Sequence, residues 1–116
     1  EPTAGLDPVG QGEVFAVIER LRRERRMTIV MVSQDAERVA EFADRVAVLC
    51  EGRIARVDVP RLIFEDMALL ERAGLAAPQV SQVAVALNRM YGSAHHFMLL
   101  DEAAQALERD LAEARP

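Results

Sequence analysis

The sequence of 116 residues contains no lysine, no tryptophan and a single cysteine. Without lysine, the chain cannot contain a G-x-x-x-x-G-K-[ST] phosphate-binding loop, because the lysine is part of that motif. Because Cys50 has no second cysteine to pair with, no internal disulfide can form, which is typical of a reducing compartment. No apolar run approaches the ~20 residues that a membrane-spanning helix needs.

Composition and charge narrow the class of protein. Hydrophobic residues make up 51 % of the chain and charged residues 28 %, which is enough for one small packed domain. Aromatic residues reach only 4 %, so the core must be aliphatic. The net charge of −5 is poorly suited to the phosphate backbone of nucleic acids, and we expect no nucleic-acid partner.

The first half of the sequence alternates between helical and strand patterns. Asp7 can cap a helix that begins at Pro8 and extends to about Arg26. The β-branched run at residues 28–33 predicts a strand buried on both faces of a parallel sheet. We then expect a helix capped by Asp35 and ending near Ala43, a buried strand at 46–50, a turn at 51–52 and a strand at 53–57. This alternation predicts an α/β fold.

The second half has helical patterns only. We expect helices at residues 60–65 and 67–73, one that starts at Pro78, and a last one capped by Asp101. The apolar faces expected for the last two are Val80, Val83, Ala84, Leu87 and Met90, and Ala104, Leu107 and Leu111. The change of pattern near residues 58–66 predicts a boundary between an α/β part, 1–65, and a helical extension, 66–116.

Four short segments carry the functional signal. They are EPTAGLDP at 1–8, VSQD at 32–35, EFADRVAVL at 41–49 and EGRI at 51–54. In order, spacing and residue type they resemble the end of the Walker B motif with its D-loop, the switch loop, and the strand and turn that follow in the ATPase subunits of ABC transporters. The resemblance covers about residues 1–65 and implies the C-terminal part of a P-loop NTPase fold, followed by a small helical tail.

The resemblance also implies roles for individual residues. Glu1 falls on the catalytic glutamate, whose carboxylate orients or deprotonates the water that attacks the γ-phosphate. By composition alone, Glu1 would be interpreted as a solvated acid. The D-loop, which crosses to the partner subunit in the nucleotide-sandwich dimer, corresponds to Ala4, Gly5, Leu6 and Asp7. Asp7 can be a plain helix cap at the same time.

Gln34 departs from the family pattern, in which a histidine occupies this switch position. The amide of Gln34 can donate a hydrogen bond, but it carries no charge and cannot shuttle a proton. We therefore expect the site formed by Glu1 and Gln34 to hydrolyse ATP more slowly than a histidine-bearing site. It would be the weaker half of an asymmetric pair of ATPases.

The motifs that hold nucleotide in this family are absent from the sequence: the P-loop, the Q-loop, the LSGGQ-type signature and the Walker B strand. All of them precede the D-loop, so we expect the sequence to be a piece of a longer protein. ATP and Mg²⁺ would be cofactors of that protein, whereas the isolated chain should bind ATP negligibly and be inactive. No metal site is expected, because His95 and His96 lie in a predicted solvated loop without other ligands. Cys50 is expected to be a small core residue.

The helical extension, residues 66–116, indicates which class of ABC-transporter ATPase the chain resembles. MALLERAGLAAPQV at 67–80 and LDEAA at 100–104 resemble the helical extension of ATPases from energy-coupling-factor importers, which take up vitamins and metal ions such as cobalt or nickel. The resemblance implies an ATPase subunit at the cytoplasmic face of the cell membrane. Its partners would be a second ATPase subunit, in a homodimer or heterodimer, and an integral membrane transporter subunit. The tail would help to hold the two ATPases together, or merely cover apolar surface.

Three other functions stay open from the sequence. An ABC transporter of another class would share the same motifs. An ABC-type ATPase acting in DNA repair would share the D-loop, although the acidic charge and the A-D-R-V-x-V-L run argue against it. A non-catalytic module that dimerises through the tail is the third alternative. The sequence does not identify the transported substrate.

Overall fold

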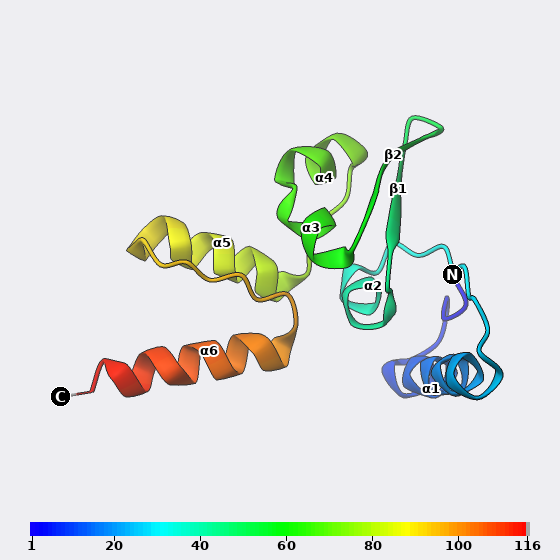
Figure 1. The fold of residues 1–116 in the computed structure, drawn as a ribbon, viewed down its shortest axis with the longest axis horizontal. Helices are drawn as coiled ribbons and strands as arrows, with labels where there is room; N and C mark the ends of the chain where they lie inside the picture. The colour runs from blue at the N-terminus through cyan, green and yellow to red at the C-terminus, as the bar shows by residue number, and fades with distance from the viewer. Residues whose placement is uncertain (116) are drawn as a thin grey trace. The chain divides into compact units, whose positions relative to one another are not determined.

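The computed structural model describes residues 1–115 and divides into two compact units, residues 1–34 and a second unit that begins at Asp35. No helix in the described residues is long and apolar enough to span a membrane. The elements, in chain order, are α1 (Pro8–Arg25), α2 (Ala36–Phe42), β1 (Val46–Cys50), β2 (Arg53–Asp58), α3 (Pro60–Glu65), α4 (Met67–Ala73), α5 (Gln79–Tyr91) and α6 (Leu100–Glu113) (Figure 1).

The first unit consists of α1, the turns before it and the irregular segment after it. Asp7 caps α1 as predicted, because its Oδ1 accepts the backbone N–H of Gly10 at 2.8 Å. The helix ends at Arg25, and Arg26 adopts the left-handed conformation with φ of 51°. Phe15 is the buried residue of this helix and is 2 % exposed.

The strand predicted at residues 28–33 is not formed in the described chain, and the prediction is wrong here. Residues 26–35 have no regular structure, and Val30 and Val32 are 92 % and 78 % exposed. The backbone nitrogen of Glu1 donates to the Val32 carbonyl at 2.8 Å. A parallel strand needs a ladder of such bonds to a neighbouring strand, and residues 1–115 do not supply that neighbour.

The second unit contains an antiparallel hairpin of β1 and β2 in which Val46 lies opposite Asp58 and Cys50 opposite Arg53. The predicted turn is confirmed. Both of its residues, Glu51 and Gly52, have positive φ, 50° and 73°, as a two-residue type I′ turn requires.

One apolar core organises the first part of the second unit. Its buried members come from α2, β1, α3, α4 and the segment before α5: Ala40, Val48, Ile63, Phe64, Leu69, Leu70 and Ala77. The expectation of a fully buried strand at 46–50 is wrong. Val48 is 2 % exposed, but Leu49 and its cross-strand partner Ile54 are 66 % and 62 % exposed, because side chains alternate between the two faces of a strand. The expected core residue Cys50 is only partly buried, and its thiol donates to the Arg72 carbonyl at 3.4 Å.

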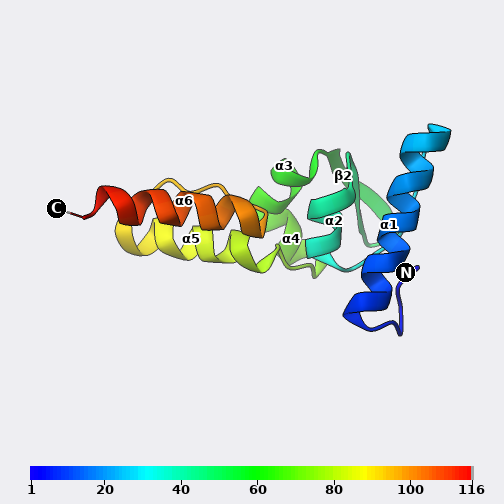
Figure 2. The same ribbon diagram turned by 90° about the horizontal axis from the view of Figure 1, so that it is seen from below.

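Helices α5 and α6 run side by side in the same direction, and residues 92–99 return along them from the end of α5 to the start of α6 (Figures 1 and 2). We call α5, this return segment and α6 the tail. Phe97 of the return segment is 6 % exposed and packs with Ala84 and Ala103 in a small second cluster. Phe97 is the large side chain of this cluster, and the two helices contribute the small side chains Ala84 and Ala103 that pack against it.

This arrangement corrects two predictions for the tail. The last helix begins at Leu100, and Glu102 rather than Asp101 binds the preceding backbone N–H groups. The predicted face of α5 is confirmed at Val80, Ala84 and Leu87 but is wrong at Val83 and Met90, and the face of α6 differs from the expected one. Ala84 and Ala103 are buried, with Val80, Leu87 and Ala106 packed against them, whereas Val83, Met90, Ala104 and Leu111 are exposed. Leu107 is partly buried.

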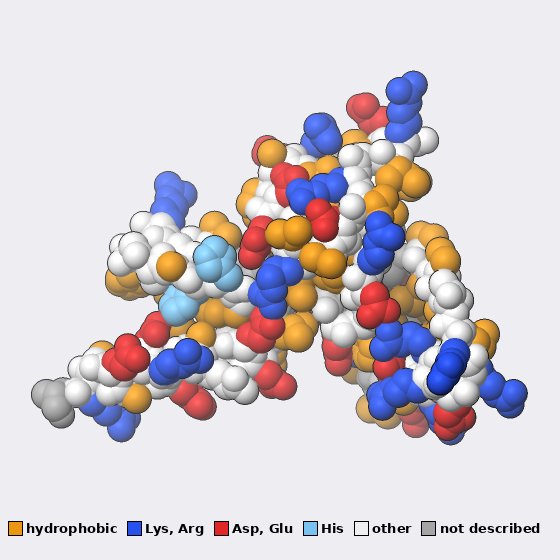
Figure 3. All heavy atoms as spheres, viewed as in Figure 1, with side chains coloured by type: hydrophobic (Ala, Val, Ile, Leu, Met, Phe, Trp, Pro, Cys, Tyr) orange, Lys and Arg blue, Asp and Glu red, His pale blue; other side chains and the backbone are white. Residues whose placement is uncertain are grey.

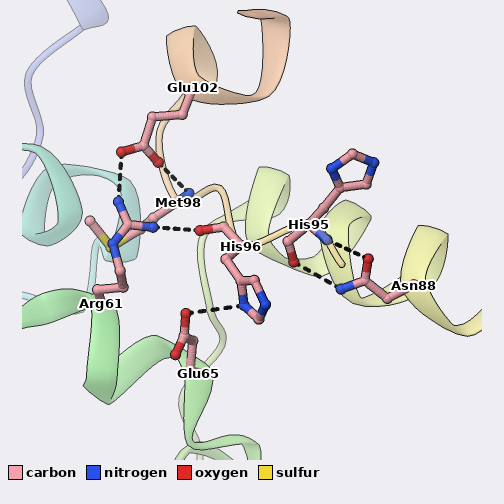
Figure 4. A network of polar contacts seen from close by, with 7 residues as sticks. All are labelled: Arg61, Glu65, Asn88, His95, His96, Met98 and Glu102. Atoms are coloured by element: carbon pink, nitrogen blue, oxygen red, sulfur yellow. Dashed lines mark hydrogen bonds and ion pairs between the residues drawn. The ribbon is translucent and has the colours of Figure 1, made fainter. Parts of the chain in front are cut away.

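A polar network joins the return segment to three helices (Figure 4). Arg61 of α3 donates to the Glu102 carboxylate at 2.6 Å and to the carbonyl of His96. The side chain of Asn88 of α5 donates to the His95 carbonyl at 2.8 Å and accepts the His95 N–H at 2.7 Å. The network therefore fixes the tail to α3 through backbone groups as well as side chains.

The two histidines differ in environment. The His95 side chain is 14 % exposed and pairs with Asp110 of α6, at 2.9 Å between Nε2 and Oδ2. The His96 side chain is 69 % exposed and lies 3.5 Å from Glu65 of α3. A solvated loop was therefore the wrong expectation for His95, because the Phe97 ring and α6 cover it.

Glu102 has a lowered pKa. Burial of its carboxylate raises the pKa, but hydrogen bonds from the Met98 and Leu99 amides and the Arg61 guanidinium outweigh that effect. A carboxyl group with a lowered folded-state pKa adds stability above its unfolded value, and that stability is lost as the pH falls through the folded value.

Replacing Ile63 with alanine should test the main core. Ile63 is 1 % exposed, so Ile63→Ala should lower the free energy of unfolding by about 3 kcal/mol, from lost transfer energy and the cavity left behind. Urea denaturation of the chain, followed by circular dichroism, measures this. The neighbouring Leu62→Ala is the matched control, because Leu62 is 44 % exposed and should cost less than half as much. Equal losses would contradict the placement of the core.

Protonation of the Glu102 carboxylate in acid should remove its contribution to the stability of the second unit. At pH 7, Glu102→Gln should cost about 1 kcal/mol, a modest value because the side chain is 36 % exposed. The difference from the unmodified chain should vanish as the pH falls from 5 to below the lowered pKa. Urea midpoints between pH 3 and 7 provide the measurement, with the exposed Glu108→Gln on the same helix as control. A difference that stays constant with pH would be inconsistent with this role for Glu102.

Candidate functional site

The structure brings together the two residues that the sequence singled out for chemistry. Oε1 of Glu1 accepts the backbone N–H of Gln34 at 2.9 Å, although the residues are 33 positions apart. Both residues are exposed, and both belong to the first unit. The bond uses one carboxylate oxygen, so Oε2 can accept a hydrogen bond from a water molecule or another donor.

Two turns, at residues 1–4 and 3–6, determine the backbone conformation that follows Glu1. The Ala4 N–H donates to the Glu1 carbonyl at 3.3 Å, and the Leu6 N–H donates to the Thr3 carbonyl at 3.1 Å. Gly5 lies between them with φ of 78°, a conformation that residues with a side chain rarely adopt. Thr3 is 9 % exposed and is therefore buried in the first unit, whereas residues 4–7 are exposed.

The predicted D-loop residues Ala4, Gly5, Leu6 and Asp7 are all exposed. The Leu6 side chain is 42 % exposed, and its carbonyl accepts the side-chain amide of Gln11 at 3.1 Å. The carboxylate of Asp7 is engaged as the cap of α1. The loop therefore has a fixed shape and an open outer surface, which suits a contact with another protein surface.

Sequence reasoning did not identify the shallow groove beside this loop. It has a volume of about 390 Å³ and is lined by Leu6, Gly10, Glu13, Val14, Val17 and Ile18. Val14, Val17 and Ile18 lie at the spacing of one helix face, and this spacing gives no indication that the face is open. Val17 is 46 % exposed in the described chain.

The chemistry of the site can be stated from its groups. A carboxylate can orient a water molecule or accept its proton, and an amide can donate a hydrogen bond. Neither group binds the phosphates of a nucleotide, and the chain has no lysine to do so. These two groups can therefore act on a water molecule, through the carboxylate of Glu1 and the side-chain amide of Gln34.

The other charged clusters are structural. Arg56 pairs with Asp58 at 2.7 Å and with Asp66 at 2.9 Å. The hydrogen bond from Arg56, followed by the Val59 amide, lowers the pKa of Asp58. The Leu69 amide, followed by Arg56, lowers the pKa of Asp66, which caps α4. These contacts tie the end of β2 to the start of α4.

The histidines and the cysteine do not form a metal site. Residues 1–115 contain no group of three or more histidine, cysteine or acidic side chains placed to hold one ion. His95 and His96 each pair with a different carboxylate, on α6 and on α3. On the face seen in Figure 3, basic and acidic side chains are interspersed across the second unit.

Comparison with known proteins gives consistent matches. The chain is 49 % identical over 87 residues to the energy-coupling factor transporter ATP-binding protein EcfA2 of Latilactobacillus sakei, covering 75 % of the chain and 30 % of that protein. It is 40 % identical over 108 residues to the protein of the same name from Clostridium perfringens, covering 92 % of the chain and 38 % of the relative. The match to the Lactiplantibacillus plantarum protein is 38 % over 112 residues, which is 96 % of the chain and 38 % of the relative.

No protein-family model matches the chain. The chain spans about a third of the length of the curated relatives it matches, and the matched part is their C-terminal portion. The similarity extends through the tail, since two of the matches cover more than nine-tenths of the chain. The chain is therefore a homologue of the C-terminal portion of the ATP-binding proteins of energy-coupling factor transporters.

Proposed function

We propose that this chain is the C-terminal part of the ATP-hydrolysing subunit of an energy-coupling-factor importer. The observation that carries the proposal is the 2.9 Å hydrogen bond between the Glu1 carboxylate and the Gln34 backbone, in a homologue of ATP-binding proteins. It joins the residue that resembles a catalytic glutamate to the residue that resembles a switch residue, and this supports the proposal.

In the longer protein, the bound Mg²⁺ and ATP supply the γ-phosphoryl group and part of the charge stabilisation that its transfer needs. Oε2 of Glu1 orients the attacking water or accepts its proton. The hydrogen bond from the Gln34 backbone to Oε1 keeps the carboxylate turned toward this position. The side-chain amide of Gln34 donates a hydrogen bond but supplies no positive charge, so the site works slowly.

The same proposal includes the surroundings of the protein. The D-loop, Ala4 to Asp7, contacts a second ATPase subunit, and the exposed surface of this loop supports that contact. An integral membrane subunit binds the ATPase pair at the cytoplasmic face of the membrane and carries a vitamin or a metal ion. The division between an ATPase core, residues 1–65, and a helical extension, residues 66–116, belongs to this proposal. In the present structure the main core includes residues on both sides of that boundary.

Glu1→Gln in the full-length subunit should abolish ATP hydrolysis. The amide keeps the size of the side chain and an oxygen for the Gln34 N–H, but it cannot accept the proton of water. We expect a loss of at least about 100-fold in kcat with ATP binding retained. Steady-state turnover and nucleotide binding are the two measurements, and the exposed Glu13→Gln on α1 is the control. A variant that turned over at the unmodified rate would refute the assignment.

Gln34→His should speed up hydrolysis. The imidazole can carry a positive charge and pass a proton, and the substitution leaves the backbone N–H in place for Glu1. We expect kcat of the full-length pair to rise by about tenfold or more. Gln34→Asn, which keeps an amide, should bring no gain and serves as the control. If the histidine variant is no faster, the glutamine is not what slows this site.

A further inference from the structure

The irregular run at residues 28–33 has the side-chain alternation of a strand. Val30 and Val32 are 92 % and 78 % exposed, whereas Ile29 is 37 % exposed and Met31 is partly buried. Exposure with a period of two arises when an extended chain has one face covered. The run is also rich in β-branched residues, which favour strands. Within the described residues it lacks only a ladder of backbone hydrogen bonds to a neighbouring strand.

One end of such a ladder is present in the first unit. The backbone nitrogen of Glu1 donates to the Val32 carbonyl at 2.8 Å, and the Glu1 carboxylate accepts the Gln34 N–H at 2.9 Å. In a parallel pair, a residue binds the carbonyl before and the N–H after the residue opposite it. Glu1 makes these two bonds, the second through its side chain, so it lies opposite Ser33. In a longer protein the Glu1 nitrogen is an amide, whose single hydrogen is enough for the bond to Val32.

The ladder can continue only toward residues that precede Glu1. After Glu1 the chain turns away, because the Glu1 carbonyl accepts the Ala4 N–H at 3.3 Å. The chain matches about a third of the length of its relatives, at their C-terminal portion, so these proteins extend further on the N-terminal side. A segment that enters Glu1 from that side in an extended conformation passes along residues 28–32.

We propose that the segment of about five residues before Glu1 in the longer protein forms a parallel strand beside residues 28–33, in the register set by the bond between Glu1 and Val32. The proposal rests on the function proposed above, in which this chain is part of a longer ATPase subunit. In this register, the residue two positions before Glu1 lies opposite Met31. It donates to the Val30 carbonyl and accepts the Val32 N–H.

This strand pair also positions the two residues of the candidate site. The carboxyl ends of neighbouring parallel strands meet at one edge of a sheet, which is where α/β proteins bind ligands. The register puts Glu1 and Gln34 at the ends of two such strands, both within the first unit. The pairing therefore holds the Glu1 carboxylate beside the Gln34 N–H.

Cysteine crosslinking in the full-length subunit tests the register. Met31→Cys, combined with a cysteine two positions before Glu1, should form a disulfide under mild oxidation, because paired strands lie about 4.8 Å apart and a disulfide joins Cα atoms about 4.4–6.8 Å apart. Cys50 and any other native cysteine are first replaced by alanine. Val32→Cys with the same second cysteine is the matched control. Its side chain points to the opposite face, so it should crosslink about tenfold less. Equal crosslinking of the two pairs, or none in either, would overturn the proposal.

Amide exchange of the unmodified full-length subunit tests the pairing without any substitution. The N–H groups of Val30 and Val32 should exchange slowly, within about tenfold of the helical N–H of Val17 in α1. Exchange at the rate of an unstructured peptide would refute the pairing. Both measurements are independent of hydrolysis. A subunit that crosslinks in this register but does not hydrolyse ATP would refute the proposed function and support the strand pair.

Discussion

Burial of Ile63 and Leu70 in one aliphatic core is the constraint on which the second unit depends. Both side chains are about 1 % exposed, and the core around them takes one or two residues from each of α2, β1, α3 and α4 and from the segment before α5. Each of these elements is too short to be stable alone, since the helices have six or seven residues and the sheet has two strands. Their shared core makes them one body, to which the tail is then attached.

Polar contacts at the ends of elements attach the tail, beside the apolar packing of Met98 and Leu99 against the main core. Arg61 reaches the Glu102 carboxylate and a carbonyl of the return segment, Asn88 holds both backbone groups of His95, and Glu37 caps α5. Such contacts fix orientation, because each needs a donor and an acceptor in line.

At the candidate site, the sequence predicted which residues are involved but not which of their atoms are in contact. The segments that resemble a D-loop and a switch loop singled out Glu1 and Gln34, and in the structure the Glu1 carboxylate accepts the Gln34 backbone N–H. Nothing in the sequence indicated that a backbone N–H would be the contacting group, because every residue except proline has one. Glu37 was missed for the same reason: an exposed acid in a first helical turn is common, and its partner is 42 residues away.

The sequence by itself determined the local elements: the caps of α1 and α2 by Asp7 and Asp35, the turn at Glu51 and Gly52, and nearly all helix bounds. These depend on neighbours within about four positions, so periodicity and capping residues specify them. Tertiary structure decided the rest. The run at residues 28–33 has no strand neighbour and stays irregular. Phe97 of the return segment fills the space between α5 and α6, so it selects which small residues of those helices are buried. Pairing and burial depend on what lies across from a residue in space, and local spacing does not specify that.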